Sequence, residues 1–409
     1  MGKDTRKIIL SPRRCAGNSQ QSAIIFPVIT AANRVEGDEY SALRWQRAVE
    51  YFRARGGVLF LSQNRFWEKH AFPQQSLAKY LTQAGVRVTW LDGYGWHPYQ
   101  PVVRFNSPLL TVKPLFQPPG NRFSSVRSWS RSLQRATINR IRSDLGGRPV
   151  IWVQEGHHEE LIGGLPYVDV YSVFDNPYLM DPHGTLCRRA SLILCQNSYA
   201  TRWFKAHHPS KTFLALPPLD LADDVFVDQK PIELPKGLPQ KLLGAVGSLM
   251  IFDFDFDLLE IFLRQLPDWG FLLVGRTDPI GKLQIQRLRH YPNFHYLPWV
   301  PRHRVAAAWK ALSATLLLYR SFRPQDGAFP TRALESLHFG VPCVATRIPK
   351  TADLDGIVPR TNNVAELVRL AVQAAQQDRS AIEVSYRELS MRMNPKEHLI
   401  RVAEFLNRP

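Results

Sequence analysis

An arginine and a glutamate, one helical turn apart, are the residues of this chain best suited to bind a charged ligand. Arg332 and Glu335 fall in the first turns of a predicted helix that opens near Pro330. Because residues three apart share a helical face, both side chains lie on the same side. A helix start beside a guanidinium suits a phosphate, and a carboxylate one turn on can accept hydrogen bonds from sugar hydroxyls. An ordinary solvated ion pair has the same pattern.

Further candidates follow two predicted strands in the first half of the chain. Asp175 comes two residues after the predicted strand 168–173. A carboxylate there can act as a general base toward a substrate hydroxyl, or it can cap the segment that follows. Glu155 and His157 come directly after another strand, where polar side chains can contact a substrate. Adjacent histidines on one segment diverge, so we do not expect a metal there.

Three alternating aspartates also invite a metal interpretation. Asp253, Asp255 and Asp257 are separated by phenylalanines and precede a predicted helix. A turn followed by a helix cap explains this pattern better than a pair of metal ligands. The sequence therefore predicts no metal site.

These residues are carried by short apolar runs that alternate with amphipathic stretches, which is typical of parallel α/β architecture. The predicted strands of the first half are 57–62, 86–92, 150–153, 168–173 and 191–195. Those of the second half are 243–247, 270–275, 294–297, 314–319 and 342–346, and two more helices are expected from about residue 363 onward. Two parallel sheets in tandem place a ligand crevice at the carboxyl ends of their strands.

Changes in composition predict the boundaries between domains. A stretch rich in proline and acidic residues separates the two sets of strands, as a linker does. We expect a basic tail over 1–22, an N-terminal Rossmann-like domain over 23–215, a linker over 216–240, a C-terminal Rossmann-like domain over 241–380, and C-terminal helices over 381–409 that pack back on the first domain.

The 409-residue chain carries a net charge of +17, which favours anionic partners such as a membrane surface, nucleic acid or phosphorylated substrates. Seven arginines and one acid lie between Arg122 and Arg148. Arg127, Arg131 and Arg135 recur every four residues and form a basic stripe if the segment is helical. The apolar residues of the segment form an imperfect opposite face: Phe123, Val126, Trp129, Leu133, Ile138 and Ile141. The pattern suits a helix on an anionic membrane surface or a solvated surface helix.

No apolar run reaches the roughly 20 residues of a spanning helix. The four cysteines, at positions 15, 187, 195 and 343, show no metal-ligand spacing. We expect a cytoplasmic protein that is peripheral on the inner face of the plasma membrane.

The second half resembles the donor domain of GT-B glycosyltransferases. The resemblance is carried by four segments in the expected order: 244–260, 266–275, 292–297 and 330–344. It is nearest to family 4 enzymes and to the membrane-associated glucuronosyltransferase that builds xanthan. Asp175 also falls where the xanthan-type enzyme has its base. The resemblance therefore implies that 23–215 is the acceptor-side domain, with Glu155 and His157 as acceptor contacts, and that 241–380 is the nucleotide-sugar domain. Family 4 enzymes carry a second glutamate eight residues before the one matched by Glu335, but this chain has Gly327 there.

The resemblance implies a site for a UDP- or GDP-linked sugar, with no other cofactor. Phosphate contacts are implied for Arg332 and for the turn Gly247–Ser248, and Arg276 is placed to reach phosphate as well. Glu335 would hold the ribose hydroxyls. Trp299 and Val300 would bracket the base, and Tyr319 would face the same crevice.

The resulting hypothesis is a hexosyl- or glucuronosyltransferase that extends a glycan or lipid-linked acceptor in the biosynthesis of a cell-surface polysaccharide. Two alternatives stay open. An epimerase on the same fold would form product without an acceptor. A basic scaffold would bind nucleic acid in a salt-dependent way, although no nucleic-acid module is recognisable.

Overall fold

The computed structural model describes most of the chain. The described residues are 32–62, 73–95, 103–104, 108–116, 123–154, 165–174, 181, 184–219, 221, 233–300, 304–320 and 328–408. The chain divides into two compact units, Met1–Leu43 and Arg44–Pro409. The described part of the first unit is the start of helix α1 (Ala32–Ala54). Everything below concerns the second unit.

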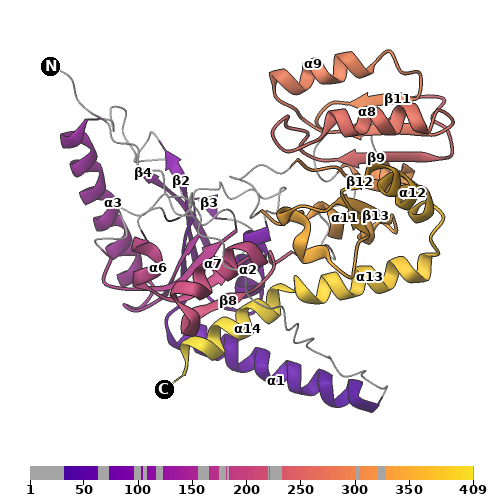
Figure 1. Cartoon of the computed structure of the whole chain (residues 1–409). Coiled ribbons are helices and arrows are strands. Elements are labelled where there is room, and N and C mark those ends of the chain that lie inside the picture. The colour runs from indigo at the N-terminus through magenta and orange to yellow at the C-terminus, as the bar shows by residue number, and fades with distance from the viewer. Residues whose placement is uncertain are drawn as a thin grey trace. The chain divides into compact units, whose positions relative to one another are not determined.

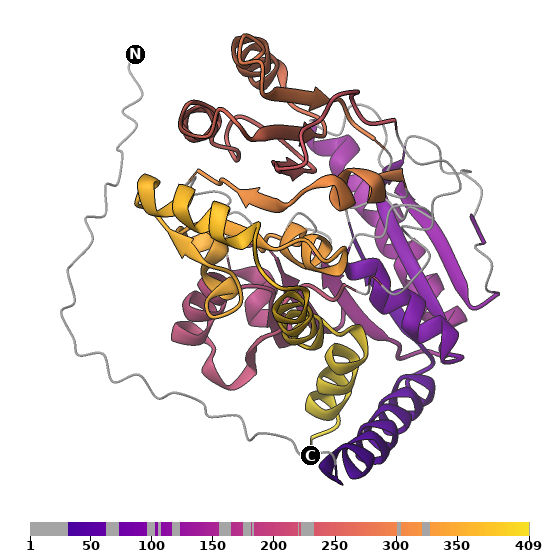
Figure 2. The same cartoon turned by 90° about the vertical axis from the view of Figure 1, so that its right-hand side faces the viewer.

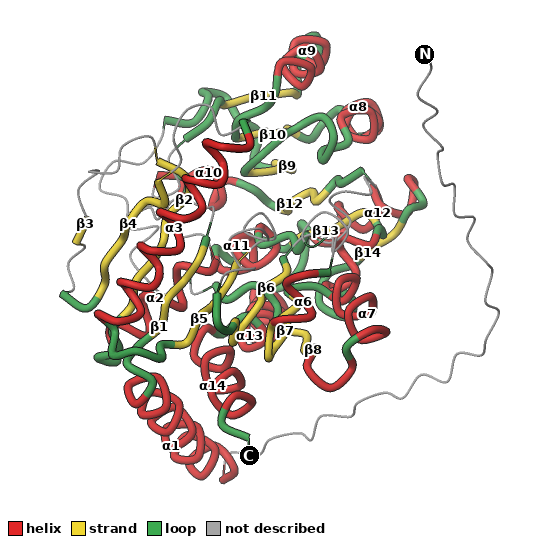
Figure 3. Tube along the Cα trace, turned by 90° about the vertical axis from the view of Figure 1, so that its left-hand side faces the viewer, coloured by secondary structure: helices red, strands yellow, loops and turns green. Residues whose placement is uncertain are grey.

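The first of two sheets has eight strands in the order β3-β4-β2-β1-β5-β6-β7-β8 (Figures 1 and 3). All its pairs are parallel except the edge pair β3–β4. The strands are β1 (Val58–Leu61), β2 (Val88–Gly95), β3 (Val103–Arg104), β4 (Leu110–Phe116), β5 (Val150–Gln154), β6 (Val168–Val173), β7 (Ala190–Cys195) and β8 (Thr212–Leu214). The sequence analysis did not predict β3 and β4 at one side of this sheet or β8 at its other edge.

Helices cover both faces of this sheet, because its central strands are apolar on both sides. One face packs against α1 and α2 (Pro73–Gln83), and its core includes Phe60, Trp90 and Trp152. The other packs against α3 (Ser124–Asp144), α6 (Thr185–Arg189) and α7 (Ser198–His207).

The second sheet has six strands, all parallel, in the order β11-β10-β9-β12-β13-β14. They are β9 (Leu242–Val246), β10 (Gly270–Val274), β11 (Phe294–Leu297), β12 (Ala314–Leu317), β13 (Cys343–Thr346) and β14 (Arg360–Thr361). Figure 2 shows the first sheet in purple and magenta and the second in colours further along the bar. The order reverses between β9 and β12, and such a switch point is where ligands bind in open α/β sheets.

The faces of this second sheet are covered by two sets of helices. One core joins the sheet to α8 (Phe256–Gln265), α9 (Pro279–Leu288) and α12 (Val364–Ala374). The other joins it to α10 (Ala306–Ala311), α11 (Arg332–His338) and α13 (Arg379–Arg392). In β9 the two residues Leu242 and Leu243 go to different cores, as the pleat of a strand requires.

The chain ends in three helices where the sequence predicted two. The prediction missed the break between α12 and α13, whereas its last helix, expected over 397–406, corresponds to α14 (Pro395–Leu406), which begins at a proline behind the cap Asn394. α14 belongs to the core of the first sheet, because Leu399, Ile400 and Val402 pack with the residues of α2.

The basic segment is helical, but its apolar residues do not form one face. In α3, Ile138 and Ile141 are buried, whereas Trp129 and Leu133 are 54% and 38% exposed. The buried side of the helix is completed by the polar residues Ser130 and Gln134. The predicted apolar face is therefore wrong, since only its second half packs on the sheet.

Candidate functional site

A glycine turn at the end of β9 is the first element of the candidate site. Gly247 has φ +123°, a conformation that residues with a Cβ rarely adopt. Its amide donates to the carbonyl of Val274 over 2.7 Å, which ties the turn to the end of β10. A Cβ on Gly275 would lie 1.6 Å from the carbonyl oxygen of Gly247. Two glycines are therefore required for the turns after β9 and β10 to approach each other.

Arg332 lies against this turn. Its guanidinium donates a hydrogen bond to the carbonyl of Ser248, 84 positions earlier in the sequence. The contact is so close that a Cβ on Gly247 would be 2.6 Å from the Nε of Arg332. The fold thus brings together Gly247, Ser248 and Arg332, which the sequence predicted as phosphate ligands.

The ring of Tyr319 lies beneath this arginine. Tyr319 follows β12, is 3% exposed, and has the Cζ of Arg332 at 5.7 Å from its ring centroid. Its backbone is held by Thr346, whose hydroxyl accepts from the amide of Tyr319 at 3.0 Å and donates to its carbonyl at 2.9 Å. Burial raises the pKa of Tyr319 to about 12, although the positive charge of Arg332 opposes this. Tyr319 is thus a neutral ring that is almost fully enclosed.

A buried ion pair completes the cluster. The Nζ of Lys350 lies 4.4 Å from the centroid of Tyr319 and 2.5 Å from the Oδ1 of Asp253. Both side chains are nearly enclosed, with exposed fractions of 8% and 10%. The sequence analysis did not predict this pair, because 97 positions separate its members and the alternating aspartates do not indicate which cation Asp253 meets.

The other predicted donor-side residues lie around the carboxyl ends of the same strands. Glu335 is half-buried in the first turn of α11, and its charge acts on Tyr319. Arg276 is exposed directly after β10. Trp299 is 54% exposed after β11, and Val300 packs against the core below it.

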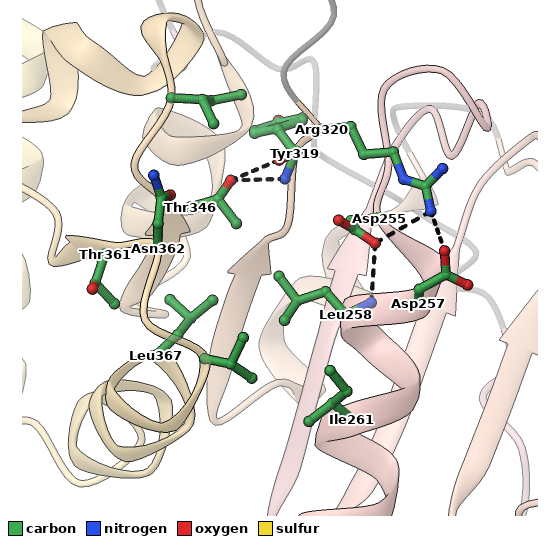
Figure 4. A pocket seen from close by; sticks show the side chains of 12 residues that line it. Asp255, Asp257, Leu258, Ile261, Tyr319, Arg320, Thr346, Thr361, Asn362 and Leu367 are labelled. Atoms are coloured by element: carbon green, nitrogen blue, oxygen red, sulfur yellow. Dashed lines mark hydrogen bonds and ion pairs between the residues drawn. The ribbon is translucent and has the colours of Figure 1, made fainter.

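A pocket of about 610 Å³ lies beside the same strand ends, between α8 and the start of α12 (Figure 4). Tyr319 and Thr346 line it together with polar and apolar residues of the two helices and of the loops and strand ends next to them: Asp255, Asp257, Leu258, Ile261, Arg320, Ile348, Thr361, Asn362, Val364 and Leu367. Gly247, Arg332 and Glu335 do not line it, so the pocket is separate from the glycine turn.

The three alternating aspartates have structural partners. Asp255 caps α8, because its side chain accepts from the amide of Leu258 at 3.0 Å. Asp257 is paired with Arg287 at 2.9 Å and also with Arg320 (Figure 4). Within the described part of the chain, no group of three His, Cys, Asp or Glu residues is placed to hold a metal ion.

The predicted acceptor-side residues Glu155, His157 and Asp175 lie outside the described residues, as does Gly327. What is described next to them is the end of each strand. β5 ends at Gln154, which is buried, and β6 ends at Val173. Both strand ends belong to the carboxyl edge of the first sheet.

Comparison with solved structures identifies the architecture. A trehalose-6-phosphate synthase from E. coli bound with UDP-2-fluoro glucose superposes with a TM-score of 0.62 at 11% identity, over 86% of this chain and 99% of that one. Sucrose-phosphate synthase from Thermosynechococcus elongatus gives 0.59 at 13% identity, over 85% and 97% of the two chains. The Anabaena protein HepE in complex with UDP gives 0.59 at 13%, over 85% and 98%. The chain has the GT-B fold.

The predicted fold class, an α/β GT-B architecture with two parallel sheets, is therefore confirmed. A sequence match points to the same class of protein. Over 113 residues the chain is 26% identical to TuaH of Bacillus subtilis, named as a teichuronic acid biosynthesis glycosyltransferase. The match spans 28% of this chain and 28% of that relative. No family model matches the sequence.

Proposed function

We propose that the protein is a glycosyltransferase that moves a sugar from a nucleotide-sugar donor to a glycan or lipid-linked acceptor. The observation that carries this proposal is the seating of Arg332 on the Gly247 turn, at the switch point of a GT-B fold. A guanidinium with a helix start behind it can neutralise the diphosphate, which must be stabilised when it leaves the sugar. Two solved neighbours hold UDP or a UDP-sugar, which supports a donor of the UDP type.

The donor would lie along the carboxyl ends of the second sheet. The Gly247 amide is bonded to Val274, so the turn would offer the amide of Ser248 to phosphate, with Arg332 and Arg276 as cations. Glu335 would accept hydrogen bonds from the ribose hydroxyls. Trp299, exposed after β11, would stack on the base, with Val300 beneath.

The acceptor would meet the donor from the first sheet, with Asp175 as the general base and Glu155 and His157 as acceptor contacts. The Asp175 carboxylate would take the proton of the acceptor hydroxyl while its oxygen bonds to the anomeric carbon. The bond from that carbon to the diphosphate breaks in the same step, and the nucleoside diphosphate leaves with the electron pair. Such a single displacement inverts the anomeric centre.

The match to a teichuronic acid protein supports a role in cell-surface polysaccharide biosynthesis, by hexosyl or glucuronosyl transfer. The assay is release of nucleoside diphosphate from UDP-, GDP- and ADP-sugars with and without a lipid-linked oligosaccharide acceptor. We expect release from UDP-sugars that depends on the acceptor, and Asp175→Asn should abolish transfer while UDP binding persists. Release of nucleoside diphosphate without an acceptor would contradict the transfer to an acceptor. Full activity of Asp175→Asn would contradict the assignment of Asp175 as the general base.

We also propose that α3 binds an anionic membrane surface. Trp129 and Leu133 are exposed one turn apart, and the exposed Arg140 lies on the same helix. An exposed aromatic beside arginines suits the interface of an anionic bilayer. Among the residues that the structure describes, no helix is long and apolar enough to cross a membrane.

Vesicle sedimentation tests this membrane contact. The protein should pellet with vesicles of phosphatidylglycerol and stay in solution with vesicles of phosphatidylcholine. The double variant Trp129→Ser/Leu133→Ser should reduce pelleting. The matched control is Phe252→Ser, which removes a side chain that is 39% exposed and lies just before α8, and it should not reduce pelleting. Equal pelleting of all three proteins would exclude α3 as the contact.

A further inference from the structure

The ring of Tyr319 lies between two cations. The Cζ of Arg332 and the Nζ of Lys350 are 5.7 Å and 4.4 Å from its centroid. Both distances fall within the roughly 6 Å over which a cation is attracted to an aromatic ring. Since the ring is 3% exposed, water does not weaken these contacts much. The ring therefore fixes where each cation can lie.

The two cations differ in how their charge is balanced. Lys350 is paired with the carboxylate of Asp253 at 2.5 Å, and a buried ammonium without such a partner would be costly. Arg332 donates to a neutral carbonyl, that of Ser248. Among the described residues, no carboxylate lies within ion-pair distance of Arg332. Within the described structure, Lys350 thus has a carboxylate partner and Arg332 has none, and it is Arg332 that lies on the glycine turn.

The segment that carries Lys350 is itself held firmly. Lys350 lies in the short helix η6 (Pro349–Leu354). Within it, the hydroxyl of Thr351 donates to the carbonyl of Thr346 at 2.6 Å, and Asp353 accepts from the amide of Ser198 at 2.9 Å. The ammonium is therefore placed by its backbone as well as by its carboxylate partner.

We infer that Tyr319 and Lys350 are positioning residues that hold Arg332 on the glycine turn for a nucleoside diphosphate. The ammonium of Lys350 also neutralises the carboxylate of Asp253, which would otherwise oppose the same anion. This inference rests on the proposed function, because it concerns the proposed phosphate ligand. It assigns Tyr319 a place behind the ligand instead of in contact with it.

The two halves of the ion pair provide the sharpest test, by calorimetric titration of UDP into purified variants. Lys350→Met leaves the carboxylate of Asp253 to oppose the phosphate, so UDP affinity should fall about tenfold. Asp253→Asn leaves the ammonium uncompensated, so affinity should stay equal or rise. If the Lys350–Asp253 pair had a purely structural role, both substitutions would weaken UDP binding alike. That result would overturn the inference.

The matched control is Arg55→Met, which breaks the Arg55–Asp169 pair in the first sheet, also partly buried and 2.9 Å long. It should lower the melting temperature without changing UDP affinity. If Lys350→Met fails to fold, variants of Tyr319 test the inference instead. Tyr319→Phe should bind UDP as the wild type does, and Tyr319→Leu about tenfold more weakly.

The possible failures are distinguishable. A wild-type protein that binds no nucleotide contradicts the proposed function itself. A wild type that binds UDP through Arg332, with Lys350→Met and Tyr319→Leu both unchanged, contradicts only the positioning role.

Discussion

The carboxyl ends of the two sheets carry different chemistry, although both sheets are parallel and covered by helices on both faces. Among the described residues, the strand ends of the first sheet carry buried uncharged groups: Ser172 on β6, Gln154 on β5 and Gln196 after β7. Those of the second sheet carry a glycine turn, with Arg332, Tyr319 and Lys350 gathered around it. Amides and hydroxyls can bind a polyhydroxyl ligand, and cations on a glycine turn suit an anionic one. One architecture thus offers two different chemical environments through the residues at its strand ends.

The glycine pair provides the largest expected difference between the sheets. Gly275→Ala would place a Cβ 1.6 Å from the carbonyl of Gly247, and we expect a loss of about 3 kcal/mol in the free energy of unfolding. In the first half, Gly147 also has a positive φ, +94°, but nothing lies within 4 Å of an added Cβ. Gly147→Ala should cost about 1 kcal/mol. Urea unfolding measures both losses. Equal losses for Gly275→Ala and Gly147→Ala would show that the turns at Gly247 and Gly275 are not in close contact.

The carboxyl edge of the first sheet can be tested at the side-chain amide of Gln154. Gln154 is 1% exposed, and its Nε2 has no hydrogen-bond partner within the described structure. We expect Gln154→Leu to keep UDP affinity and to raise the KM for acceptor about tenfold, because one hydrogen bond to the acceptor is lost. Steady-state kinetics with each substrate varied in turn measures this. A raised donor KM instead would place Gln154 in the donor site.

The sequence alone predicted local features of the fold and the candidate site, but not contacts between residues far apart in the chain. β11 was predicted with the bounds 294–297 that the structure has, because a short apolar run between turn residues leaves little choice. The helix start that carries Arg332 and the glycine turn at Gly247 are local patterns that can be seen in the sequence, and the role of both residues as phosphate ligands stays a prediction. The contact of Lys350 with Asp253 depends on the pairing of strands far apart in sequence, and no local pattern encodes it. In α3, the packing of the sheet decided which apolar residues are buried, and the sequence pattern alone pointed to the wrong face.

A smaller effect, on the pH dependence of stability, is expected from His398, which is buried in α14. Burial lowers the pKa of His398 from 6.5 to about 3, so the unfolded chain binds the proton more readily than the folded one. Stability is therefore full above pH 6.5 and is lost as the pH falls toward 3. Between pH 6.5 and 5.5 the free energy of unfolding should drop by on the order of 1 kcal/mol.

Urea unfolding across this pH range checks the effect. His398→Leu should flatten the slope, whereas His207→Gln, at an exposed histidine of α7, should leave it unchanged. A slope that survives in His398→Leu would mean that another group controls acid unfolding.

The most direct test of the donor site in the second sheet is calorimetric titration of UDP into the wild type, Arg332→Ala and the matched control Arg264→Ala. Arg264 is also on a helix of the second sheet, but its side chain is 64% exposed and paired with Glu260. We predict that Arg332→Ala weakens UDP binding about 30-fold, the loss of a charge-assisted contact, and that Arg264→Ala does not. Equal UDP affinity in the wild type and Arg332→Ala would contradict the account.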